Sequence, residues 1–377
     1  MTDRSASSHS GSESISNQSM SNSTATSGAS PGRAPRIVLI GAILSVWRKI
    51  PRSAPDTPAS HPLSKTDHVG YKQEGLRTAG RWRIIEFNDI GELASPVAIA
   101  GFEGWNDAGE AASGVVNHLG IAWQATPIGA IDPEDFYDFQ VNRPVIEIEG
   151  GHTQRLIWPT TRISLARAAS ADPTVPPTGL SRDIVLVHGI EPNMRWRAFS
   201  EELVQALEGL GVKLIVLLGA LLADAPHTRP VPVSVGSSNS TLATDVGVGR
   251  VDYKGPTGIV GVLQHTCTGA GIPTVSLWAQ VPHYVAQPPS PKATLALLRG
   301  VEDILDAPLP LADLPDESRA WERGVDELAQ QDSEVADYVR TLEEAKDAMD
   351  LPEASGDAIA REFERYFRRH GGEPGGI

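Results

Sequence analysis

Two uninterrupted apolar runs constrain the fold of this chain more than any other feature. They are Ile184–His188, within IVLVHG, and Leu214–Leu218, within KLIVLLGA. Such runs are typical of central strands that are covered on both faces of a sheet. Further strands are predicted at Val97–Ala100, Ile128–Ile131, Val145–Ile148, Arg155–Trp158, Val231–Val235 and Thr274–Trp278, and helices at Ala108–Leu119, Trp196–Leu210, Ile259–Ala270 and Lys292–Asp306. Strands that alternate with helices indicate βαβ units, so we predict an α/β fold with a mostly parallel sheet in a core domain over residues 81–310.

The first 80 residues have a different composition. The first 30 contain twelve serines and almost no apolar side chains, which predicts a disordered extension. Ile37–Trp47 is apolar and has basic residues on both sides. It is too short to span a membrane, so we expect either an unstructured segment or a short interfacial anchor there. A linker rich in Pro, Ser, Thr and Gly follows, and we assign residues 1–80 to an extension and linker.

The acidic residues are concentrated after residue 310. Between residues 301 and 353 there are 17 acidic and 4 basic side chains, which gives 4 − 17 = −13 of the net charge of −15. Apolar residues recur every seventh position within Leu314–Met349, which predicts one helix with a short seam. A second helix is predicted near Asp357–Arg369. We expect this helical region, residues 311–377, to pack either on the domain or on another subunit.

Composition and the absence of common motifs exclude several classes of protein. A single cysteine, Cys267, excludes a disulfide framework, a CxxC motif and an all-cysteine zinc site, and it is expected to be a small core residue. A reducing, cytoplasmic location fits this cysteine usage. The acidic balance argues against nucleic-acid binding. No G-x-S-x-G, HExxH or GxGxxG motif occurs, and we predict no metal and no cofactor.

Two loops that follow predicted strands carry residues with possible chemistry. Ligands of open α/β sheets bind at the carboxyl ends of the strands. The first loop could be structural, with Asn106 or Asp107 capping the next helix, or it could bind a ligand. The second could hold a hard cation through its carboxylates, although its interleaved aromatic residues favour a packed loop or an interface. The candidate residues are Gly101, Glu103, Gly104, Trp105, Asn106, Asp107 and Gly109 in the first loop, and Asp132, Glu134, Phe136 and Tyr137 in the second. We expect Trp105→Ala to destabilise the fold or an oligomer by a few kcal/mol, as for a buried aromatic.

Two later loops offer further alternatives. His188 and Glu191 end a buried strand and could form an acid–base pair, although a structural role is the more common one for such a histidine. His227, Arg229 and the hydroxyl cluster around Ser237, Ser238 and Asn239 could cradle a phosphate, or could cap turns. No activated nucleophile accompanies either group, so no catalytic residue is assigned.

Five ordered segments carry a resemblance to a known family. They are Pro96–Asn117 (PVAIAGFEGWNDAGEAASGVVN), Asp132–Pro144 (DPEDFYDFQVNRP), His188–Phe199 (HGIEPNMRW to F), Leu217–Val233 (LLGALLADAPHTRPVPV) and Tyr253–Leu263 (YKGPTGIVGVL). Together they resemble the proteasome assembly chaperone family, second-chaperone type, in its actinobacterial branch. The resemblance runs from about Arg83 to the acidic helices and does not extend to residues 1–80.

The resemblance implies a three-layer α/β/α sandwich similar to phosphorylases and hydrolases, here with a C-terminal helical extension. It also implies a homo-oligomer, with a trimer among the possible assemblies, and proteasome subunits as partners. Eukaryotic relatives dock through a tail with a penultimate tyrosine, whereas this chain ends Glu373-Pro-Gly-Gly-Ile377. The function expected is a proteasome-assembly-chaperone-like interaction module with an unknown client. The alternative is a small-ligand-binding protein or enzyme with a phosphorylase-like cleft, which requires Arg229 and its neighbours to meet the glycine loop.

Overall fold

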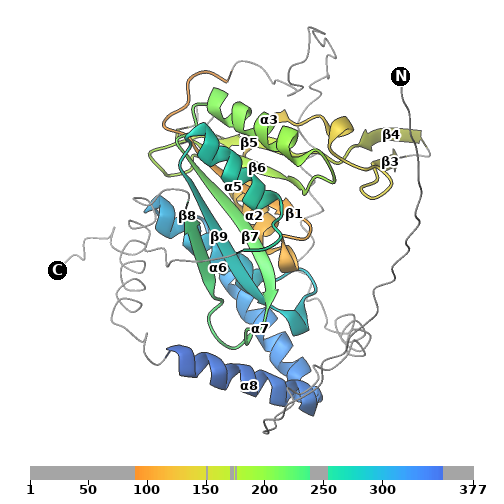
Figure 1. Cartoon of the computed structure of the whole chain (residues 1–377), viewed down its shortest axis with the longest axis vertical. Coiled ribbons are helices and arrows are strands. Elements are labelled where there is room, and N and C mark those ends of the chain that lie inside the picture. The colour runs from red at the N-terminus through yellow and green to blue at the C-terminus, as the bar shows by residue number, and fades with distance from the viewer. Residues whose placement is uncertain (1–89, 150–151, 170–173, 175, 238–253, 351–377) are drawn as a thin grey trace, which may run out of the picture. The chain divides into compact units, whose positions relative to one another are not determined.

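A computed structural model describes residues 90–149, 152–169, 174, 176–237 and 254–350 of this chain (Figure 1). The predicted extension over residues 1–80 and the predicted helix Asp357–Arg369 lie outside these residues. No helix within the described ranges is both long enough and apolar enough to span a membrane.

A seven-stranded sheet forms the centre of the fold, with the strand order β2-β5-β6-β1-β7-β9-β8. The four central strands run parallel, and both edges carry antiparallel strands. The strands are β1 (Val97–Glu103), β2 (Thr126–Ala130), β5 (Arg162–Ala166), β6 (Ile184–Ile190), β7 (Leu214–Ala223), β8 (Val233–Ser237) and β9 (Thr274–Pro282). The mostly parallel α/β sheet is therefore confirmed.

Helices cover both faces of the sheet because alternate residues of each central strand point in opposite directions. In β1, Val97 and Ile99 enter one buried cluster with α2 (Ala111–Ala122) and α6 (Pro291–Leu305). Ala98, Ala100 and Phe102 enter a second cluster on the other face, with α3 (Trp196–Gly209) and α5 (Ile259–Ala270). The continuous apolar runs of the sequence thus correspond to strands that are buried on both sides.

Apart from the exact ends of the strands, the strand predictions differ from the structure in two respects. β5 was not predicted, and it joins the sheet beside β6 in an antiparallel register. The predicted strands Val145–Ile148 and Arg155–Trp158 exist as β3 (Val145–Glu149) and β4 (His152–Ile157), but they pair only with each other. They form a two-stranded hairpin separate from the main sheet (Figure 1).

The acidic helical region contains a break where one helix was predicted. α7 (Leu314–Gln331) and α8 (Ser333–Asp350) are separated at Asp332, whose φ of −131° and ψ of 109° are extended. α7 buries Leu314 against the core cluster of the α6 face, and it buries Trp321 and Val325 beside Tyr284. The first part of this region therefore packs on the core domain of the same chain.

Candidate functional site

The glycine loop between β1 and α2 is held tightly by its own polar groups. The Asp107 carboxylate accepts the backbone N–H of Ala112 at 2.6 Å and the hydroxyl of Ser113 at 2.5 Å. Burial raises the pKa of Asp107, while these hydrogen bonds oppose the shift. The backbone N–H of Ala220 donates to Asn106 O at 2.8 Å and fixes the loop to β7. The expected capping role of Asp107 is confirmed.

The glycines of this loop serve its turn and its close packing. Gly104 has a φ of +126° and Gly109 a φ of +62°, in the left-handed region that favours glycine. A Cβ on Gly101 would lie 2.7 Å from the backbone oxygen of Ala112. Trp105, between the two turns, is 85% exposed. The prediction that it is a buried aromatic of this fold was wrong, because the loop turns its side chain outward.

The loop after β6 lies against the glycine loop. The Glu191 N–H donates to Glu103 O at 2.8 Å, and the Glu191 carboxylate accepts the Ile259 N–H at the start of α5 at 2.8 Å. His188 Nε2 lies 3.3 Å from Glu103 Oε1, and this contact lowers the pKa of Glu103. His188 therefore pairs with Glu103, while Glu191 caps α5. The suggested acid–base pair of His188 with Glu191 is not formed.

Asn106 is the unusual residue at this end of the sheet. It is 3% exposed, and neither polar atom of its side chain has a hydrogen-bond partner among the described residues. A Cβ on Gly258 would lie 3.7 Å from Asn106 Cβ and 2.9 Å from Glu191 Oε1. Gly258 therefore packs too closely against Glu191 to carry a side chain, and Asn106 lies beside it.

The second loop is packed through its aromatic residues. Phe136 and Tyr137 are buried, and the Phe136 ring meets the Phe199 ring edge-on at 5.4 Å. The Tyr137 hydroxyl donates to Ile190 O at 2.8 Å, and burial raises the pKa of Tyr137 to about 12. Asp132 accepts the Glu134 N–H at 3.0 Å, which caps a short turn. The packed-loop interpretation is confirmed for Phe136 and Tyr137.

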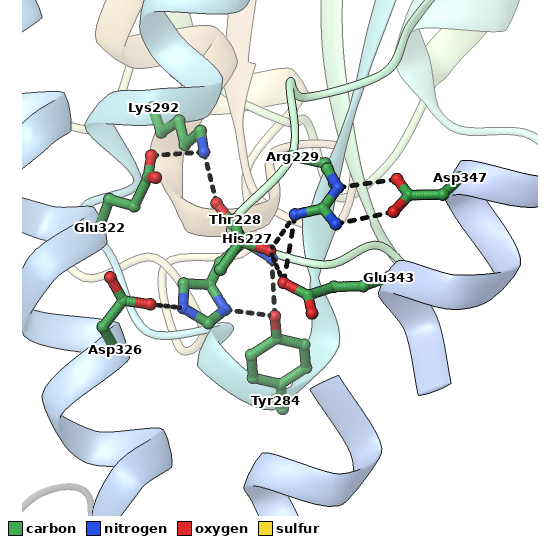
Figure 2. A network of polar contacts seen from close by, with 9 residues as sticks. All are labelled: His227, Thr228, Arg229, Tyr284, Lys292, Glu322, Asp326, Glu343 and Asp347. Carbon is green, nitrogen blue, oxygen red and sulfur yellow. Dashed lines mark hydrogen bonds and ion pairs between the residues drawn. The ribbon is translucent and has the colours of Figure 1, made fainter. Parts of the chain in front are cut away.

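Arg229 is engaged by carboxylates of α8 (Figure 2). Its Nε and Nη2 each donate to the Asp347 carboxylate at 2.8 Å, and Nη1 lies 3.3 Å from Glu343. Asp347 raises the pKa of Arg229, and the arginine lowers the pKa of Asp347. Ser237 is the last residue of β8, while Ser238 and Asn239 lie outside the described residues. The guanidinium therefore binds acidic side chains of its own chain.

A buried histidine next to Arg229 links three elements (Figure 2). The Tyr284 hydroxyl accepts the His227 backbone N–H at 2.7 Å and lies 2.7 Å from His227 Nδ1. Its own proton is then directed to Nδ1, so Nε2–H donates to Asp326 of α7 at 3.0 Å. Lys292 of α6 bonds His227 O and pairs with Glu322 at 2.5 Å. We call the following residues the helix clasp: His227, Tyr284, Lys292, Glu322 and Asp326, together with Arg229, Glu343 and Asp347.

Most members of the helix clasp were missed by the sequence analysis. Tyr284, Asp326 and Asp347 come from segments that lie 57 to 118 residues from their partners. No local motif marks such contacts. The only available signal was the dense acidic charge of α7 and α8 opposite the isolated basic residues Arg229 and Lys292.

Cys267 is poorly suited to act as a nucleophile. Cys267 is buried, and burial raises the pKa of its thiol to about 11, which disfavours the nucleophilic thiolate. The described ranges contain no group of three or more His, Cys, Asp or Glu side chains placed to hold a metal ion. The contacts of Arg229 are with α8, whereas the glycine loop contacts β7, Glu191 and the start of α6.

The fold and its loops define the structural class of this protein. It is an α/β protein with a mostly parallel sheet, helices on both faces, and polar loops at the carboxyl ends of its central strands. The model of the PAC2 family matches residues 101–329. This match spans more than half of the chain, and the chain therefore belongs to the PAC2 family.

Solved structures of similar proteins agree with this assignment. A PAC2 family protein from Streptomyces avermitilis is 56% identical, with a TM-score of 0.59, covering 65% of this chain and 99% of that one. A proteasome-assembly chaperone homologue from Mycobacterium tuberculosis is 54% identical, with a TM-score of 0.58, covering 64% and 99%. An archaeal proteasome activator from Pyrococcus furiosus shares the fold at 16% identity and a TM-score of 0.51, covering 65% and 98%. No curated protein sequence matches this chain.

Proposed function

We propose that this chain is a proteasome-assembly-chaperone-like interaction module that acts in the cytoplasm as a homo-oligomer, with a trimer as the assembly to test first. Its family membership and the Mycobacterium tuberculosis homologue support this role. Proteasome subunits are the proposed partners, and the client within the proteasome is not identified. We propose no enzymatic activity, because the buried Cys267 and the carboxylate-bound Arg229 leave neither group available for a substrate.

One observation carries the proposal. Several large apolar side chains are exposed on two loops and a hairpin, and these segments contact one another. The glycine loop contacts Glu191, and Asn193 accepts hydrogen bonds from Asp138 N and Asn142 Nδ2 in the second loop. The second loop leads into the β3–β4 hairpin, and Trp158, directly after β4, packs on Phe139 of the loop. The exposed residues along this path are Trp105, Val141, Val145, Ile146, Ile148, Leu156, Trp158 and Met194. Large exposed apolar groups at one region mark interaction surfaces.

The test is native mass by light scattering on the full chain, alone and mixed with separately expressed proteasome α- and β-subunits from the same cell. Co-elution with an α-subunit or a half-proteasome is expected. The double variant Val141→Ser, Ile148→Ser should weaken this co-elution, whereas Ile121→Ser, on the exposed side of α2, is a matched control. A stable homo-oligomer that binds neither subunit would contradict the proposed partners.

A further inference from the structure

The helix α8 is held on the core domain by a small set of aromatic and polar contacts. The Tyr338 ring lies edge-on to the rings of His283 and Tyr284, with centroids 5.5 and 6.1 Å apart. The Tyr338 hydroxyl donates to the Asp224 carboxylate at 3.2 Å. The aromatic contacts therefore join α8 to the segments that directly follow β7 and β9.

Charged groups make the second half of this attachment (Figure 2). Arg229 donates twice to the Asp347 carboxylate at 2.8 Å. Glu343, four residues earlier on the same side of α8, accepts the Thr228 hydroxyl and lies 3.3 Å from Arg229. The Asp347 side chain is 54% exposed, so water and salt weaken this pair. We call the core residues of both halves the α8 seat: Asp224, Thr228, Arg229, His283 and Tyr284.

A single residue connects α7 to α8. Asp332 is extended between the two helices, and its carboxylate caps α8 by accepting the Glu334 N–H at 2.9 Å. Figure 1 shows α8 turned at an angle to α7. The apolar period nevertheless continues across this bend, at Leu314, Trp321, Leu328, Val335 and Leu342. The sequence of both helices therefore also suits one continuous helix, which would direct α8 away from the seat of its own copy.

The family match separates the seat from α8. The matched residues 101–329 contain the whole seat and end before α8 begins. No described residue of α8 belongs to the buried cluster on either face of the sheet. The chain can therefore release α8 without opening its main core.

We propose that copies of this chain associate by exchanging α8, so that the α8 of one copy occupies the seat of another. The contacts between copies are then the same as those within a copy, so the seat already fits its partner in shape and charge. Reciprocal exchange gives a pair, and cyclic exchange gives a closed ring. The inference deepens the proposed function by naming the contact that joins the homo-oligomer, and it rests on that function for the role of the assembly.

Two charge-reversed variants of the full chain, co-expressed with different affinity tags, test the exchange. Arg229→Asp and Asp347→Arg each place like charges at this contact, both within a copy and between identical copies. In the mixture, Asp347 of the first variant meets Arg229 of the second, and the two introduced side chains are opposite in charge as well. Native mass spectrometry should show mixed complexes at least about threefold above their statistical share.

Asp337 and Arg340 supply a matched control pair. They pair with each other within α8 at 2.9 Å, and both side chains are exposed. Asp337→Arg and Arg340→Asp, co-expressed in the same way, should form mixed complexes at the statistical share. Statistical mixing of the Arg229 and Asp347 variants, or a mixture that stays monomeric although melting curves show both variants folded, would overturn the exchange.

Asp332→Ala tests the hinge while the seat stays intact. This change removes the cap of α8 and places a strong helix former at the bend, so the continuous helix is favoured over the bent form. In light scattering over a dilution series, the full-chain variant should self-associate at a concentration lower by roughly threefold or more. Glu344→Ala, at an exposed position of α8, should behave like the natural chain. Unchanged or weaker self-association of Asp332→Ala would contradict the proposal.

Co-elution with proteasome subunits tests the proposed function separately. Co-elution that is found together with statistical mixing of the charge-reversed variants would refute the exchange of α8 alone. Enriched mixed complexes without any co-elution would refute the proteasome partners alone.

Discussion

Trp105 and Phe199 are two large aromatic side chains in opposite environments. Phe199 is fully buried between the rings of Phe102 and Phe136, at 6.0 and 5.4 Å. Phe199→Ala should therefore lower the free energy of unfolding by about 3–5 kcal/mol. Trp105→Ala should change it by less than about 0.5 kcal/mol, because the indole is already in water. Urea unfolding of both variants checks this, and a large loss for Trp105→Ala in a monomeric sample would contradict the exposed position.

The sequence supports the position of the glycine loop but not the direction of its side chains. Gly104 and Gly109 indicate a turn, and Asp107 precedes a helical pattern, so the capping role could be predicted. The outward direction of Trp105 depends on the left-handed turn at Gly104 and on the bond from Ala220 to Asn106. Neither contact leaves a local signal in the sequence, and tryptophan is on average a buried residue.

At the scale of elements, the contacts of His227 in the helix clasp predict that the attachment of α7 depends on pH. The charged and titratable groups around His227 are Tyr284, Asp326, Lys292 and Glu322. Burial lowers the pKa of His227 from its ordinary value of 6.5, while Asp326 opposes the shift and Lys292 adds to it. The folded chain therefore binds this proton less readily than the unfolded chain. The stabilising contribution is complete above about pH 6.5 and is lost as the pH falls toward the lowered pKa.

The lowered pKa of His227 can be tested through the pH dependence of unfolding. The urea concentration at the midpoint of unfolding should be lower at pH 5.5 than at pH 7.5 for the natural chain. His227→Gln, which can still donate to Asp326, should show a smaller difference between these two pH values. His265→Gln, at an exposed position of α5, should behave like the natural chain. An identical pH dependence in His227→Gln would show that another group is responsible.

Element predictions succeeded where local signals were strong. α5 has the predicted bounds because Gly258 and Gly271 flank an apolar helix, and Gly271 adopts a left-handed φ of 77° at its end. β5 was missed because its five residues include Arg162 and Ser164 and lack a long apolar run. The break at Asp332 was missed because neither glycine nor proline marks it and the apolar period continues across it.

For the whole molecule, the relatives indicate which part of the chain is needed for the fold. The matched part of this chain covers 99% of the Streptomyces avermitilis structure and 99% of the Mycobacterium tuberculosis structure. It makes up only 65% and 64% of this chain, respectively. The matched family model begins at residue 101 and ends at residue 329 within α7. A PAC2 fold therefore does not require the first 80 residues. We propose that residues 81–310 form the core domain and that residues 311–377 extend it.

Truncation separates these parts. The chain of residues 81–377 should melt within about 2 °C of the full chain, which corresponds to less than about 1 kcal/mol for a fold of this size. Residues 81–313 should melt at a clearly lower temperature, because this variant loses the buried Leu314, Trp321 and Val325 and the partners of His227 and Arg229. Calorimetry of the three proteins at one concentration gives the comparison. A marked loss in the first truncation would mean that the first 80 residues stabilise the core, and an unchanged midpoint in the second would mean that α7 adds nothing to it.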